Sequence, residues 1–146
     1  MSTSETLCNR SQFARTDAVA DPESAAVIRR EFSDWLHEHF TLDATKACDM
    51  VLAVNEALAN AAEYAYATAD CPGVMQVQAH YDDGAATLTV TVTDQGAWRE
   101  SDAGANQIRR GRGIPLMQAL ADRATLDSSP TGTRVCLEWG QVSAPH

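Results

Sequence analysis

The longest periodic segment, from about Ala44 to Ala67, has the hydrophobic spacing of an amphipathic helix and contains no Pro or Gly. At about 100° per residue, its polar and apolar side chains separate onto two faces. The narrow polar face carries Asp49, Glu56, Asn60 and Glu63, and the opposite face carries Ala47, Val51, Val54, Leu58, Ala61 and Ala65. We therefore expect the apolar face to be buried on a sheet or a second helix.

A clean alternation follows this helix and predicts a β-hairpin. Residues 74–81 and 86–93 read as strands, and Asp82-Asp83-Gly84 between them is a strong turn signal. In the second strand, Leu88, Val90 and Val92 alternate with threonines. Such a pattern is typical of a strand with one buried and one wetter face.

The other predicted elements flank these two. A weak pattern at 12–18 indicates a first edge strand, and Asp21-Pro22 begins a helix that extends to about Phe40. A helix with Pro115 near its first turn extends to about Asp122, and two strands follow, at 124–127 and 133–139. The apolar stripe of the helix that starts at Pro22 consists of Ala25, Ile28, Phe32, Trp35 and Leu36.

Composition limits the class of protein. A chain of 146 residues with 45% hydrophobic residues fits one globular domain, which we place at 11–140, with flexible ends at 1–10 and 141–146. The net charge of −9 argues against general nucleic-acid binding. Without an apolar run of about 18 residues or a signal-peptide core, we expect a cytoplasmic protein with no membrane span. The four dispersed cysteines fit free thiols.

The polar face of the long helix carries the first candidate chemistry. Glu56 and Asn60 are four residues apart, so their side chains lie on adjacent turns of one face. A carboxylate and an amide oxygen are hard ligands suited to Mg²⁺, and the carboxylate is also a candidate base. The alternative is an ordinary solvated helix face.

Two glycine-containing segments carry the remaining candidate chemistry. The carboxylate of Asp94-Gln95-Gly96, at a strand end, can accept a hydrogen bond from an exocyclic amine, while the glycine lets a flat ring approach the backbone. Gly111-Arg112-Gly113 opens a helix, where free N–H groups, the helix dipole and a forked guanidinium suit a phosphate chain. Taken alone, each segment is more often a plain turn. The polar residues 97–110 between them form a loop long enough to be functional.

No P-loop and no nucleophile elbow occurs in the sequence. The order of the three segments instead resembles the GHKL, or Bergerat-fold, family of ATPases and kinases, from about Phe13 to Trp139. Glu56–Asn60 is similar to its N-box, Asp94–Gly96 to its G1 box and Gly111–Gly113 to its G2 box. Thr133 is similar to the threonine near the end of that fold. The runs LAVNEALANAAEYAY and GRGIPLMQALAD most resemble the anti-sigma factor serine-protein kinases.

The resemblance implies an α+β fold of two layers, a mixed and largely antiparallel sheet with three helices on one face. It implies ATP and Mg²⁺ as cofactors, with Asn60 as the metal ligand and Glu56 as the general base. Asp94 would receive the adenine amine with help from Thr133, and residues 97–110 would form a lid. The remaining implied nucleotide contacts are Gly96, Gly111, Arg112 and Gly113.

The resemblance also implies a function and partners. The expected protein is a homodimeric serine kinase that binds a sigma factor and phosphorylates a serine of an anti-sigma antagonist, in transcription regulation and stress response. One alternative is a module that binds ATP and regulates a partner without chemistry. Another is a kinase domain that acts on other regulators of a phosphatase-linked stress module. Arg29 and Arg30 are candidate partner contacts or part of a solvated helix face.

Overall fold

The computed structural model describes residues 5–8, 11–19, 21–67, 74–94, 115–129 and 132–143. Residues 115–120 form a short helix in addition to the named elements. The named elements are β1 (Glu5–Cys8), β2 (Gln12–Val19), α1 (Pro22–His39), α2 (Ala44–Ala67), β3 (Val74–Asp82), β4 (Thr87–Asp94), β5 (Arg123–Ser129) and β6 (Gly132–Trp139).

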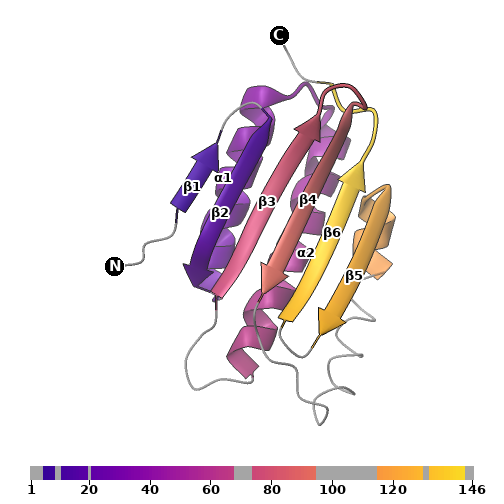
Figure 1. The fold of residues 1–146 in the computed structure, drawn as a ribbon. Coiled ribbons are helices and arrows are strands. Elements are labelled where there is room, and N and C mark those ends of the chain that lie inside the picture. The colour runs from indigo at the N-terminus through magenta and orange to yellow at the C-terminus, as the bar shows by residue number, and fades with distance from the viewer. Residues whose placement is uncertain are drawn as a thin grey trace.

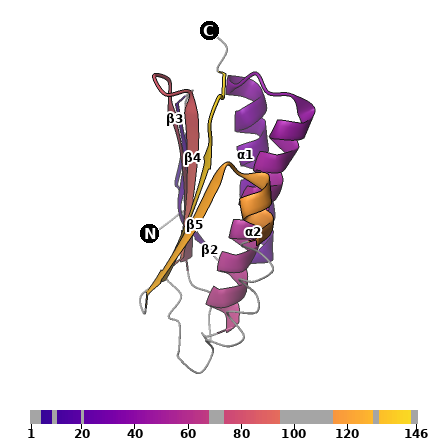
Figure 2. The same ribbon diagram turned by 90° about the vertical axis from the view of Figure 1, so that its right-hand side faces the viewer.

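The strands form one six-stranded sheet in the order β1-β2-β3-β4-β6-β5 (Figure 1). Every strand pair in it is antiparallel. In Figure 2 the helices lie on one side of the sheet and leave its other face open. The predicted α+β fold of two layers, with three helices on one face, is confirmed.

Helix α1 begins where the sequence predicts. The carboxylate of Asp21 accepts a hydrogen bond from the N–H of Ser24 at 2.7 Å, and Pro22 occupies the first turn, where its missing N–H costs nothing. All five residues of the predicted apolar stripe are buried. Phe32 and Trp35 from this stripe stack against Phe13 of β2, with ring centroids about 6 Å apart. This aromatic group fixes α1 onto the sheet.

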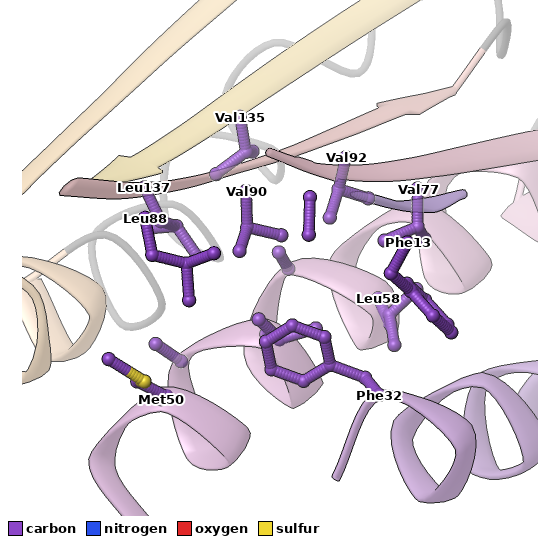
Figure 3. Close-up of a cluster of buried hydrophobic side chains, with 14 of the residues drawn as sticks. Phe13, Phe32, Met50, Leu58, Val77, Leu88, Val90, Val92, Val135 and Leu137 are labelled. Carbon is purple, nitrogen blue, oxygen red and sulfur yellow. The ribbon is translucent and has the colours of Figure 1, made fainter. Parts of the chain in front are cut away.

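The core lies between the sheet and the helices (Figure 3). Strands β3, β4 and β6 alternate in burial along their length, as the two-residue period requires. Leu88, Val90 and Val92 of β4 are buried and point into this layer, as predicted. From α2, Met50, Val54 and Leu58 pack against them and are fully buried.

The N-terminal edge of the sheet differs from the expectation. The strand at 12–18 was expected to be an edge strand, but β2 lies between β1 and β3. Residues Glu5–Cys8, within the segment expected to be flexible, form the edge strand β1. Four residues are too few to show an alternation of their own, so β1 is defined by its pairing with β2 rather than by a local signal.

The C-terminal segment also differs from the expectation of a flexible tail at 141–146. Val142 is fully buried, and its C=O accepts a hydrogen bond from the Tyr81 hydroxyl at 2.6 Å. The N–H of Val142 donates to the C=O of Ala86, and Thr41 bridges to Ser143. Residues 140–143 therefore tie the β3–β4 turn to the α1–α2 connection, because several backbone groups find partners there.

Among the described residues, no helix is long and apolar enough to cross a membrane. Cys48 and Cys136 are free thiols, in agreement with the sequence-based expectation.

Candidate functional site

Three polar residues interrupt the apolar layer between helices and sheet. In the described part of the chain, Asn60, Asp94 and Thr133 are the buried polar residues, with 8%, 4% and 5% of their surface exposed. They come from α2, β4 and β6, which are separated in sequence. All three were predicted from the sequence as nucleotide contacts.

Asp94 and Thr133 lie directly opposite each other. They are register partners on the antiparallel strands β4 and β6, so their side chains project from neighbouring positions of one sheet face. Asp94 continues the buried alternation of Leu88, Val90 and Val92, which turns its carboxylate toward the helix layer. The pair occupies the end of β4 and the start of β6, at the lower end of the sheet in Figure 1.

Asn60 belongs to the helix layer. Helix α2 packs on β4 and β6, and its C-terminal part descends to the same end of the sheet (Figure 1). Although Asn60 falls on the polar face of the helical wheel, its side chain is buried, so an ordinary solvated face does not describe it. Glu56, one turn earlier, is partly exposed. The structure therefore places a buried amide and a more accessible carboxylate on adjacent turns.

Two of the buried polar groups have no hydrogen-bond partner among the described residues. These are Nδ2 of Asn60 and Oγ1 of Thr133. Leaving a buried donor or hydroxyl unpaired costs about 1–3 kcal/mol. A folded protein retains such groups where a ligand pairs them, which is the arrangement expected of a polar ligand held between α2, β4 and β6.

A ligand with an exocyclic amine and a metal-bound phosphate chain fits these residues. A carboxylate accepts an amine N–H, a hydroxyl can donate or accept beside it, and an amide oxygen is a hard ligand for Mg²⁺. Mg²⁺ is commonly held by one or two protein groups plus substrate phosphates. No group of three His, Cys, Asp or Glu residues that could hold a metal occurs in the described part of the chain.

Several predicted contacts lie outside the described residues. They are Gly96, Gly111, Arg112, Gly113 and the expected lid at 97–110. The described helix at 115–120 begins directly after that segment, and Met117 within it is fully buried.

Met75 is a residue of this region that the sequence analysis did not assign. It is the register partner of Asp94 on β3 and is fully buried, so it flanks the carboxylate on the side away from Thr133. The pair could have been found by counting outward from the Asp82-Asp83-Gly84 turn, because hairpin register follows from the turn.

A separate cavity of about 400 Å³ lies at the opposite end of the fold. Trp139, one of its lining residues, pairs with Leu88 at the start of β4, whereas Asp94 ends that strand. Lys46, also in its lining, donates to the C=O of Gly140 at 2.8 Å. This cavity is therefore distinct from the region of Asn60, Asp94 and Thr133.

Comparison with known families gives the class of the protein. The chain matches the model of the histidine kinase-like ATPase domain over residues 18–139. This range covers most of the chain, and the protein belongs to that family of ATP-binding domains. Membership agrees with the GHKL resemblance read from the motifs.

A solved structure shares the fold. The chain is similar to the crystal structure of the RsbU and RsbW domains of Rv1364c from Mycobacterium tuberculosis, with a TM-score of 0.68 and 26% sequence identity. The similarity covers 92% of this chain and 33% of that chain, so the protein spans about a third of the length of the structure it matches.

Proposed function

We propose that the protein is an ATP- and Mg²⁺-dependent serine kinase of the anti-sigma factor type. The observation that carries the proposal is the burial of Asn60, Asp94 and Thr133 in an otherwise apolar layer, with polar atoms of Asn60 and Thr133 that have no partner among the described residues. The anti-sigma motif resemblance and the similarity to a structure containing an RsbW domain support this choice within the family.

The adenine base is recognised at the strand pair. Asp94 accepts a hydrogen bond from the exocyclic amine, and Thr133 directly opposite contributes its hydroxyl to the same pocket. A buried carboxylate that pairs an amine makes a charge-assisted bond, which is stronger than a neutral one. Gly96, which follows Asp94 by two residues, leaves room for the ring.

The phosphate chain is held from the helix side. Asn60 would supply the protein oxygen to Mg²⁺, and the ion would neutralise phosphate charge during transfer. Gly111 and Gly113 allow the phosphates to approach the backbone, and Arg112 supplies donors to phosphate oxygens.

Glu56 acts as the base toward a partner protein. Its partial exposure, one turn from Asn60, fits a group that must meet a hydroxyl arriving from outside. Glu56 accepts the proton of the partner's serine, the serine oxygen bonds to the γ-phosphorus, and the bond to the β-phosphate oxygen breaks to release ADP. The transfer depends mainly on positioning and on charge neutralisation.

The partners in this proposal are a sigma factor, which the protein binds, and an anti-sigma antagonist whose serine it phosphorylates. A homodimer is the proposed assembly. Because the matched structure also contains an RsbU domain, an action on other regulators of a multidomain system is a variant of the same proposal. Capture of a sigma factor by the purified protein distinguishes the two.

The decisive experiment has two measurements. Calorimetric titration with ATP, with Asp94→Asn as control, tests nucleotide binding. Transfer of radiolabelled phosphate from ATP to the cognate antagonist is then compared for wild type, Glu56→Ala and Asp49→Ala, a matched acidic residue of the same helix. Loss of transfer only in Glu56→Ala supports the base assignment. Equal transfer by all three proteins contradicts it.

A second candidate is an ATP-binding regulator without chemistry. The three buried polar residues account for nucleotide binding, and Glu56 is not among them. Mass spectrometry of the partner after incubation with Mg-ATP separates the two candidates, because phosphoserine appears only with a kinase.

A further inference from the structure

The edge strand β5 has a charge pattern that is complementary to itself. In the sheet order, β5 pairs with β6 on one side, and no described strand pairs with its other side. Arg123, Thr125 and Asp127 are exposed on the open sheet face. Ala124 is buried and Leu126 is partly buried on the helix side. The strand therefore has a polar row and an apolar row beside an edge that no described strand occupies.

The backbone groups available at this edge follow from the hydrogen-bond alternation of the sheet. In an antiparallel sheet, successive residues point their N–H and C=O to opposite neighbouring strands. The N–H of Tyr81 donates to Ser11, so the backbone groups of Tyr81 face β2. The register runs without shifts from β3 through β4 and β6 to β5. Following this alternation from strand to strand, the N–H and C=O of Ala124 and Leu126 face away from β6, toward the edge that no described strand occupies.

We infer that β5 pairs antiparallel with β5 of a second copy of the chain, about a two-fold axis at Thr125. In this register, Ala124 of one copy and Leu126 of the other exchange the free backbone hydrogen bonds. Arg123 of one copy lies opposite Asp127 of the other, and by symmetry this ion pair forms twice.

The register is selected by charge. Pairing shifted by two residues along the edge keeps the hydrogen bonds but places Asp127 opposite Thr125, so neither carboxylate meets a guanidinium. Charges on an edge strand usually prevent sheets from joining. Here the order basic–neutral–acidic along Arg123, Thr125 and Asp127 reverses that effect, because an antiparallel second copy presents it in the opposite direction.

An exposed leucine lies at the same edge. Leu116, in the helix at 115–120 that precedes β5, has 41% of its surface exposed. Figure 1 shows this helix behind β5 at that edge of the molecule. A two-fold axis normal to the sheet keeps both helix layers on the same side of the joined strands.

The test is a charge exchange measured by sedimentation velocity at low ionic strength, where exposed ion pairs are least screened. The wild type is expected to be a dimer. Arg123→Asp alone places aspartates opposite each other, and Asp127→Arg alone does the same with arginines. Each is expected to weaken self-association about tenfold or more, because both symmetric ion pairs become pairs of like charges.

Mixing the two variants restores the pairing. In an equimolar mixture, the aspartates at positions 123 and 127 of the Arg123→Asp variant each face an arginine of the Asp127→Arg variant, so a heterodimer of near wild-type affinity is expected. Repulsion within a chain, as from Glu138 opposite position 123, is unchanged by mixing and cannot mimic this result. Asp83→Arg, in the exposed turn between β3 and β4 and away from β5, is the control and should remain dimeric.

A monomeric wild type, single variants that dimerise like the wild type, or a mixture that stays monomeric would each overturn the inference. The inference rests on the homodimer of the proposed function and locates its interface, and ATP titration of the same variants is a separate readout. A variant that loses dimers but binds ATP leaves the nucleotide site intact.

Discussion

Asp94 at the end of β4 faces Thr133 at the start of β6 across one register position, and both side chains are buried on the helix side of the sheet. A carboxylate and a hydroxyl held side by side in an apolar layer form a rigid pair of polar groups with defined spacing, because both belong to paired strands rather than to loops. Nucleotide binding is expected to depend on this arrangement.

Asp94→Asn is expected to weaken ATP binding by about 10-fold to 100-fold, because a charge-assisted hydrogen bond is worth about 1.5–3 kcal/mol. Calorimetric titration measures the change. Asp83→Asn, in the exposed turn between β3 and β4, is the control and should bind like the wild type. Equal affinity for Asp94→Asn and wild type would remove Asp94 from the adenine site.

Thr133→Val is expected to separate stability from binding. The substitution keeps the shape of the side chain and removes a buried hydroxyl that has no partner among the described residues, so the free energy of unfolding should stay the same or rise by about 1 kcal/mol. ATP affinity should fall by about fivefold, the value of one neutral hydrogen bond. Urea denaturation and calorimetry measure the two effects, with Thr91→Val on the open sheet face as control.

Asn60→Leu tests whether Asn60 is the protein ligand of Mg²⁺. If Asn60 supplies the protein ligand to Mg²⁺, the gain in ATP affinity that Mg²⁺ gives the wild type should be largely lost, while binding in EDTA changes little. The comparison requires titrations with and without Mg²⁺. Asn55→Leu, a partly buried residue of the same helix, is the matched control. A full Mg²⁺ effect in Asn60→Leu would contradict the assignment.

Tyr81→Phe tests how much the hydrogen bond from Tyr81 to Val142 stabilises the fold. The substitution removes the 2.6 Å hydrogen bond to the C=O of Val142 and leaves that acceptor buried, so the free energy of unfolding should fall by about 1–2 kcal/mol. Denaturation in urea measures the loss against Thr89→Val, which removes a hydroxyl from the open face. ATP affinity should be unchanged, since Tyr81 pairs with Leu88 at the far end of β4 from Asp94.

Elements with a strong local period could be predicted from the sequence. The start of α1 follows from its Asp21-Pro22 cap, the bounds of α2 match the predicted 44–67, and the inward positions of Leu88, Val90 and Val92 follow from the two-residue period. In each case the signal lies within a few turns or strand positions of the residue concerned, so no distant contact is needed to read it.

Features that depend on distant contacts could not be predicted in this way. Strand β1 has no period of its own and is defined by pairing with β2. The anchoring of Val142 depends on Tyr81 and Ala86, which are far away in sequence. The helical wheel placed Asn60 on a polar face, but only the packing of α2 on β4 and β6 shows that this position is buried. The nucleotide motifs at 96 and 111–113 remain predictions.

The two-residue period that directs Asp94 inward also restricts how β4 can change in length. Inserting one residue between Leu88 and Asp94 would turn the carboxylate to the open face and put Thr93 in its place. Removing one residue would also turn the carboxylate to the open face. Inserting or removing two residues keeps the carboxylate on the helix side, but Asp94 is then no longer opposite Thr133. Natural or engineered insertions in this protein should therefore be tolerated in the connections and excluded from this strand.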